Sequence, residues 1–145
     1  MREPDLARLL LEAHRSLADE WVASMEERGY PGVRSGHAVI ALTIDRRTGT
    51  RLTDLAERAR MTKQGMMLLV DDLESRGFVR RVADPEDARA KIVRLTTRGR
   101  TYVAESRRVL QAVEGRARRG LGDRRYEQVR DALEWLAGEE EDEEE

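Results

Sequence analysis

Apolar residues recur at helical spacing over most of this chain. From residue 5 to residue 28 the apolar positions are separated by four, three, four and four residues, which predicts a long amphipathic helix. Similar patterns predict helices at about 35–44, 53–59, 63–76 and 97–119, and a last helix from residue 123 onward. We therefore expect a mainly helical protein.

Capping residues and glycines divide these helices. The segment 29–32, with two glycines around Tyr30 and Pro31, should end the first helix. Four further helices have N-cap candidates, which are Ser35, Thr62, Thr96 or Thr97, and Asp123. Gly77 is placed to end the helix at 63–76 in a left-handed conformation.

Two short β-branched runs, 78–82 and 91–95, lie on either side of a polar loop and predict a hairpin. Two short helices followed by a hairpin, in one run from Leu52 to Gly99, is the order of a winged helix-turn-helix. The expected fold class is mainly α with a small β-hairpin wing, flanked by N- and C-terminal helices. Terminal helices with apolar stripes usually find a symmetric partner, so we expect a homodimer. The alternative is one compact helical monomer.

The charge distribution fits a DNA-binding module better than the net charge of −2 indicates. The last seven residues are all acidic, so the first 138 residues carry 27 basic and 22 acidic side chains, a net charge of +5. Residues 51–100 contain 12 basic and 8 acidic side chains, and this excess can neutralise phosphates. We expect the acidic tail, 139–145, to be disordered and solvated; the alternative is a decoy that competes with DNA.

The composition excludes several classes of function. Without cysteine the chain has no disulfide, thiolate metal site or thiol sensor, and two distant histidines argue against zinc. The sequence has no glycine-rich phosphate loop, so we expect neither an enzyme nor a cofactor. No apolar run is long enough for a membrane span, and the N-terminus lacks a signal pattern. A cytoplasmic location is therefore expected.

Five short motifs, taken together in order, resemble the MarR family of bacterial transcription regulators. They are Leu55-Ala56, Met61–Gln64, Leu73–Val79, Asp84–Lys91 and Leu95–Gly99. The resemblance implies a single domain over 1–138, with a DNA-binding core at about 51–99 and dimerisation helices at about 5–28 and 97–138. It also implies a homodimeric repressor of a pseudo-palindromic operator in double-stranded DNA.

The second helix of the pair is the expected reading helix. Residues near its N-terminal end reach base edges in the major groove, and here these are Lys63, Gln64 and Met67. Gln64 can contact adenine, and Met67 or Leu68 can meet thymine methyl groups. The alternative for Gln64 is an ordinary solvated helix residue.

Further arginines are expected to contact the DNA backbone. Arg51 and Arg60 are candidate phosphate contacts at helix ends. Arg80, in the first strand, is a backbone contact or a surface charge.

Arg89 is the strongest single candidate for DNA contact. A hairpin tip can enter the minor groove, whose negative potential attracts arginine. The resemblance implies that Asp87, two residues earlier, pairs with Arg89 and directs it. The alternative is a solvated surface ion pair of little energetic value.

Three residues depart from the family pattern. Leu68 and Asp72 stand where a basic residue is common, and Ala88 replaces a frequent arginine. We expect Asp72 to face phosphates and repel them, which would lower DNA affinity. The alternatives are a dimeric protein-interaction module that has lost specific recognition, and a non-specific DNA-binding protein.

The resemblance also implies a small aromatic or phenolic effector. Candidate pocket residues lie on the first two helices and are His14, Trp21, Met25 and His37. Trp21 and Met25 are equally explained as core residues, and the two histidines as surface or capping residues.

Overall fold

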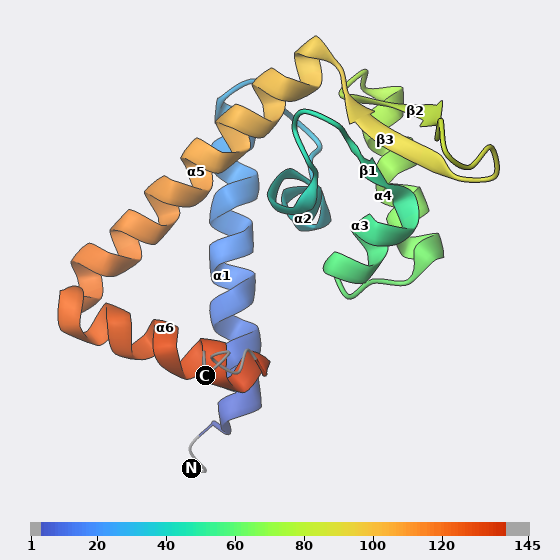
Figure 1. Ribbon diagram of the computed structural model, residues 1–145. Coiled ribbons are helices and arrows are strands. Elements are labelled where there is room, and N and C mark those ends of the chain that lie inside the picture. The colour runs from blue at the N-terminus through green and yellow to red at the C-terminus, as the bar shows by residue number, and fades with distance from the viewer. Residues whose placement is uncertain (1–3, 139–145) are drawn as a thin grey trace. The chain divides into compact units, whose positions relative to one another are not determined.

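The computed structural model describes residues 4–138, and contacts divide the chain into one compact unit that ends at Leu110 and another that begins at Gln111. The predicted acidic tail, 139–145, lies outside the described residues. The helices are α1 (Leu6–Glu27), α2 (Ser35–Thr43), α3 (Leu52–Arg58), α4 (Lys63–Ser75), α5 (Thr97–Leu121) and α6 (Asp123–Ala137). The strands are β1 (Thr50–Arg51), β2 (Val79–Ala83) and β3 (Lys91–Leu95) (Figure 1). The predicted fold class is confirmed.

Side-chain caps set several helix ends where the sequence indicated them. The Thr62 hydroxyl accepts the Gly65 backbone N–H at 3.0 Å and starts α4. The Thr96 hydroxyl accepts the Gly99 N–H at 2.9 Å at the start of α5. Gly77 has φ +77° and follows the end of α4, as predicted.

Two of the predicted caps are wrong. Ser35 is the first residue of α2, and Arg34 precedes it as N-cap, because the His37 imidazole accepts the Arg34 N–H at 2.8 Å. Asp123 is the first residue of α6. Its carboxylate accepts from Arg118 at 2.6 Å and is not used to cap the helix.

The predicted hairpin is confirmed and gains a third strand. β2 and β3 pair antiparallel with Val79 opposite Leu95, and β1 joins the free edge of β3, giving the order β1-β3-β2. The sequence pattern does not predict β1, because a strand of two residues is too short to show an alternation of apolar and polar positions. Gly49 precedes it with φ +77°, and a Cβ there would lie 2.5 Å from the Val93 carbonyl oxygen. The loop before β1 can therefore lie against β3 only with glycine at this position.

In the first unit, α3 and α4 contact the sheet, and α2 packs against α1, α3 and α4 (Figure 1). The α4 residues predicted to face the core are buried, namely Met66, Leu69, Val70 and Leu73. Trp21 of α1 is buried as well, and its indole N–H donates to the Ser106 hydroxyl on α5 at 3.2 Å. Phe78 and Tyr102 stack with ring centroids 4.6 Å apart, so the start of β2 is fixed to α5.

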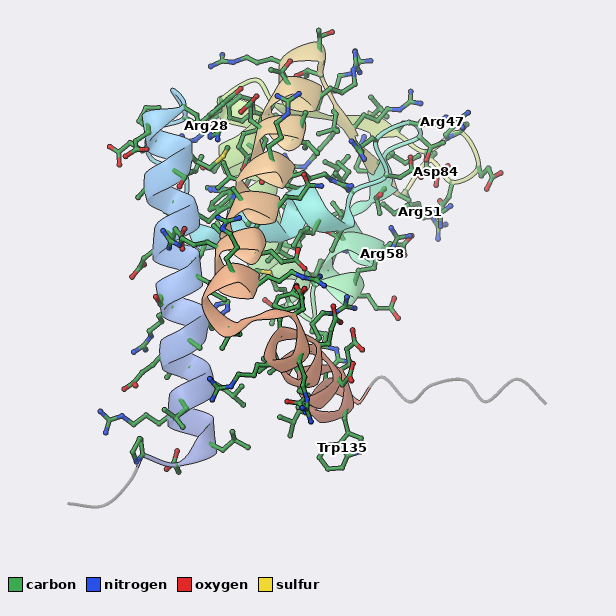
Figure 2. The ribbon with its side chains drawn as sticks, turned by 90° about the vertical axis from the view of Figure 1, so that its left-hand side faces the viewer. Arg28, Arg47, Arg51, Arg58, Asp84 and Trp135 are labelled. Carbon is green, nitrogen blue, oxygen red and sulfur yellow. The ribbon has the colours of Figure 1, made fainter. Side chains whose placement is uncertain are left out.

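The second unit holds the end of α5 against α6. The Tyr126 hydroxyl donates to the Glu114 carboxylate, and the Arg118 guanidinium lies 5.0 Å from the Tyr126 ring centre. Other apolar side chains of α6 are exposed, including Trp135, which is 78% exposed (Figure 2). Along residues 4–138, no helix combines the length and apolar character needed to cross a membrane.

Candidate nucleic-acid interface

The helix-turn-helix presents the start of α4 to solvent. Arg60 turns the chain with φ +50°, and the Thr62 cap then begins α4. This places Lys63 and Gln64 in the first helical turn, both exposed. Met67 and Leu68, in the next turn, are 41% and 63% exposed. The four predicted reading residues thus share one accessible end of the helix.

The base of the wing is held by an ion pair that the sequence did not indicate. Asp84 is buried, and its carboxylate accepts from Arg51 Nε at 2.6 Å and lies 2.5 Å from Arg51 Nη2. Figure 2 shows these two side chains next to each other. The Glu86 N–H and the Arg51 guanidinium lower the pKa of Asp84 below its usual value. Arg51, predicted as a phosphate contact, therefore also anchors the wing to the edge of α3.

Asp87 supports the wing tip differently from the prediction. Its carboxylate accepts the backbone N–H of Arg89 at 3.0 Å, which forms an Asx turn at the wing tip. Within residues 4–138 no ion pair joins the Asp87 carboxylate to the Arg89 guanidinium, because the carboxylate is turned toward the backbone. The Arg89 side chain is exposed and extends from a tip of fixed backbone shape.

A hollow of about 310 Å³ separates the wing from the helix-turn-helix. It is lined by Arg51, Leu52, Thr53, Lys63, Asp87, Arg89, Ala90 and Lys91. Four of these side chains are cationic and one is anionic, so the hollow attracts a negatively charged partner. The hollow joins the start of α4 to the wing tip in one basic surface.

The expectation that Asp72 repels phosphates is wrong. Asp72 is half-buried and faces the interior, with its carboxylate 2.8 Å from His37 Nε2 and 3.0 Å from Arg76 Nε. Arg76 also donates to the carbonyl oxygens of Pro31 and Gly32, each at 2.8 Å. The carboxylate at this position therefore ties α4 to α2 and to the turn after α1.

A second set of ion pairs fastens β2 to α4. The Arg81 guanidinium lies 2.5 Å from the Asp71 carboxylate and 3.0 Å from that of Glu74. Arg80, the residue before Arg81, is exposed on the other face of the sheet because side chains alternate along a strand. Its predicted contact with DNA would have to come from the face opposite α4.

The effector candidates are divided between the core and the surface. Trp21, Met25 and His37 are buried in the first unit, at 1%, 0% and 0% exposure, and His14 is exposed on α1. Burial lowers the pKa of His37 below its usual value of 6.5. A ligand could reach the three buried side chains only after the core opens.

Comparisons with known proteins agree with this geometry. Residues 32–90 match the model of the MarR family. No curated protein sequence matches the chain.

Solved structures with a similar fold are transcription regulators. One is the transcriptional repressor CouR bound to a 23-mer DNA duplex, with a TM-score of 0.81 and 22% identity over 92% of each chain. Another is CouR from Rhodococcus jostii RHA1 bound to p-coumaroyl-CoA, with a TM-score of 0.75 and 25% identity over 92% of each chain. A probable regulator from Pseudomonas aeruginosa has a TM-score of 0.80 and 20% identity, over 92% of this chain and 98% of that one. Over the residues of its helix-turn-helix and most of its wing, the chain is therefore similar to the MarR family, and its fold is that of winged-helix transcription regulators.

Proposed function

We propose that this chain is a homodimeric repressor that binds a pseudo-palindromic operator in double-stranded DNA. The observation that carries the proposal is the single basic surface formed by the start of α4 and the wing. Lys63, Arg89 and Lys91 line one hollow, and Gln64 lies exposed beside it in the first turn of α4. The transcriptional repressor CouR, which has a similar fold, has a solved structure bound to a 23-mer DNA duplex, and this supports the proposal.

The two parts of this surface read different grooves. The start of α4 enters the major groove, where Gln64 contacts adenine and Lys63 contacts a phosphate or guanine. Met67 and Leu68 meet thymine methyl groups. Arg89 enters the adjacent minor groove, where the potential is most negative in A·T tracts.

Exposed apolar side chains support the dimer. On α1 they are Leu6, Leu9, Leu10, Leu11 and Leu17, and on α6 they are Val129, Leu133, Trp135 and Leu136. Apolar side chains left in solvent in such number on a helix mark an interaction site. A two-fold dimer would place its reading helices in successive major grooves, so the half-sites would lie about 10–10.5 base pairs apart.

A small aromatic effector is the proposed release signal. CouR has been crystallised with p-coumaroyl-CoA, and this supports an aromatic ligand for the present chain. The ligand would enter near Trp21, Met25 and His37 by opening the core, with His14 at the surface of α1. Because coupling is reciprocal, operator DNA would then weaken the affinity for the effector by the same factor.

Substitutions at the two reading parts test the proposal. Arg89→Ala and Gln64→Ala should each lower affinity for a selected operator duplex by about 1–3 kcal/mol and relax base preference at one position. Arg125→Ala, which removes an exposed arginine from α6, is the matched control and should bind as the parent chain does. The readout is fluorescence anisotropy at several salt concentrations.

The same titrations separate the alternatives. Equal binding to operator and random duplexes, lost steeply with salt, would contradict specific recognition and leave a non-specific binder. No binding to any duplex would leave a protein-interaction module.

A further inference from the structure

The outer face of the wing sheet carries a second basic site, away from α4. An open pocket of about 230 Å³ is lined by Arg46, Arg47, Gly49, Arg80, Arg94, Leu95 and Arg100. Its five arginines come from the loop before β1, from β2, from β3 and from the start of α5. We refer to these five residues as the outer-face arginine pocket.

Strand register brings two of these charges together. Arg80 and Arg94 are directly opposite each other in the antiparallel pair of β2 and β3. Like charges directly opposite each other on neighbouring strands repel, and this repulsion destabilises the sheet. Arg81, on the other face of β2, pairs with acidic residues of α4, whereas Arg80 does not.

The arginines are oriented, but their charges are not neutralised. Arg94 Nε donates to the Thr48 carbonyl at 3.3 Å, and Arg100 donates to the Leu95 carbonyl at 3.4 Å and to the Thr97 hydroxyl at 3.1 Å. These acceptors carry no formal charge. Across residues 4–138, none of the five guanidinium groups forms an ion pair with a carboxylate.

The loop that supplies Arg46 and Arg47 has a fixed shape. The Asp45 carboxylate accepts the backbone N–H groups of Arg47 and Thr48 at 2.8 and 2.9 Å. Gly49 lets the loop lie against β3, since a Cβ there would be 2.7 Å from Arg94 Cγ. Asp45 is the nearest acidic residue along this loop, and it lines a different hollow, with Asp54 and Arg58. The pocket is therefore preorganised and strongly cationic.

We propose that the outer-face arginine pocket binds the phosphate groups of a small polyphosphate ligand. Guanidinium groups bind phosphate oxygens through paired, charge-assisted hydrogen bonds. A volume of about 230 Å³ lies below the 300–1,000 Å³ of pockets that enclose a whole drug-sized molecule. It suits a cluster of phosphates whose remaining portion extends into solvent. Duplex DNA is the other source of phosphates, but α4 lies on the opposite face of β2.

Inorganic triphosphate is the probe for this proposal, and it requires no operator. Calorimetric titration of the full chain should show binding that exceeds any effect of sodium chloride at equal ionic strength. Arg80→Gln with Arg94→Gln should weaken binding about tenfold or more, because charge-assisted contacts are lost. The same double variant should melt at a higher temperature than the parent chain when no triphosphate is present. Arg124→Gln with Arg125→Gln removes two exposed charges from α6 and should bind triphosphate as the parent does.

The two sources of phosphate give different results. Triphosphate binding that is weakened about tenfold or more in the Arg80/Arg94 variant, and unchanged in the Arg124/Arg125 variant, supports the proposal, whatever happens to DNA affinity. Equal triphosphate binding by the parent and this variant would overturn it. So would the absence of triphosphate binding combined with weaker binding of the variant to a long random-sequence duplex, because the pocket would then hold DNA backbone. Since the triphosphate arm uses no DNA, its outcome is independent of the proposed repressor function.

Discussion

His37 does more for the fold than its place in the sequence indicates. Its Nδ1 accepts the Arg34 N–H at 2.8 Å, so the imidazole proton is on Nε2, which lies 2.8 Å from the Asp72 carboxylate. A second proton would have to displace the Arg34 N–H from Nδ1. Burial and this occupied acceptor favour the neutral ring, and the pKa of His37 is below 6.5.

We predict that His37 makes the chain less stable in mild acid. Unfolded His37 takes up a proton near pH 6.5, whereas the native ring does so only at lower pH. Between these values the unfolded chain binds more protons, so the free energy of unfolding falls as the pH is lowered below 6.5. Urea denaturation at about pH 5, 6, 7 and 8 measures how far the free energy of unfolding falls.

Glutamine is the informative replacement for His37. It can accept the Arg34 N–H as the third residue of a capping box, but it does not titrate. His37→Gln should therefore flatten the fall in stability below pH 6.5. His14→Gln removes the other, exposed histidine and should keep the parent's fall. A parent-like fall in His37→Gln would show that another group causes it.

At the scale of elements, α4 is fixed at its start and along its C-terminal half. The Thr62 hydroxyl caps the start. In the C-terminal half, Asp72 faces His37 of α2, and Asp71 and Glu74 pair with Arg81 of β2. The reading residues thus lie at the exposed N-terminal end of a helix whose C-terminal half is tied to two other elements.

Loss of the Thr62 cap should destabilise the first turn of α4. Thr62→Ala leaves the Gly65 N–H without its 3.0 Å partner, and a lost N-cap costs about 1 kcal/mol. Thr53→Ala, at an exposed position in the first turn of α3, is the control and should change stability much less. Urea denaturation of both variants measures the difference, and equal losses would contradict a specific capping role.

The elements of this chain differ in how far the sequence predicts them. Helices such as α1 and α4 follow from apolar periodicity and capping residues, and the hairpin follows from two β-branched runs. β1 is missed because it is only two residues long and forms through pairing with β3. The direction of Asp72 is missed as well, because its partner His37 is far away in sequence. The Arg51–Asp84 and Arg81–Glu74 pairs depend equally on tertiary structure.

At the scale of the whole molecule, the central expectation is a two-fold dimer. The described chain exposes leucines on α1 and α6 that its own fold leaves in solvent. Burying them against a second copy would remove apolar surface from water at about 25 cal/mol per Å². The dimer is also what would give a palindromic operator its two half-sites.

A charge placed on α6 should disrupt this dimer. Leu133 is 44% exposed, and Leu133→Glu would bury a carboxylate in the proposed interface, which shifts the chain toward monomer. Leu42→Glu, at a leucine of α2 that is 57% exposed, is the matched control and should leave the dimer intact. Light scattering across a concentration series gives the molecular mass. Identical masses for both variants would contradict a dimer interface through α6.

Selection of bound fragments from the source genome tests the central claim, sequence-specific recognition of DNA, most directly. The full chain is mixed with sheared genomic DNA at moderate salt, and the retained fragments are sequenced. We predict one recurrent pseudo-palindromic sequence, with half-sites about 10–10.5 base pairs apart, whose recovery falls sharply with Arg89→Ala. Uniform recovery of the genome, or none, would contradict the claim.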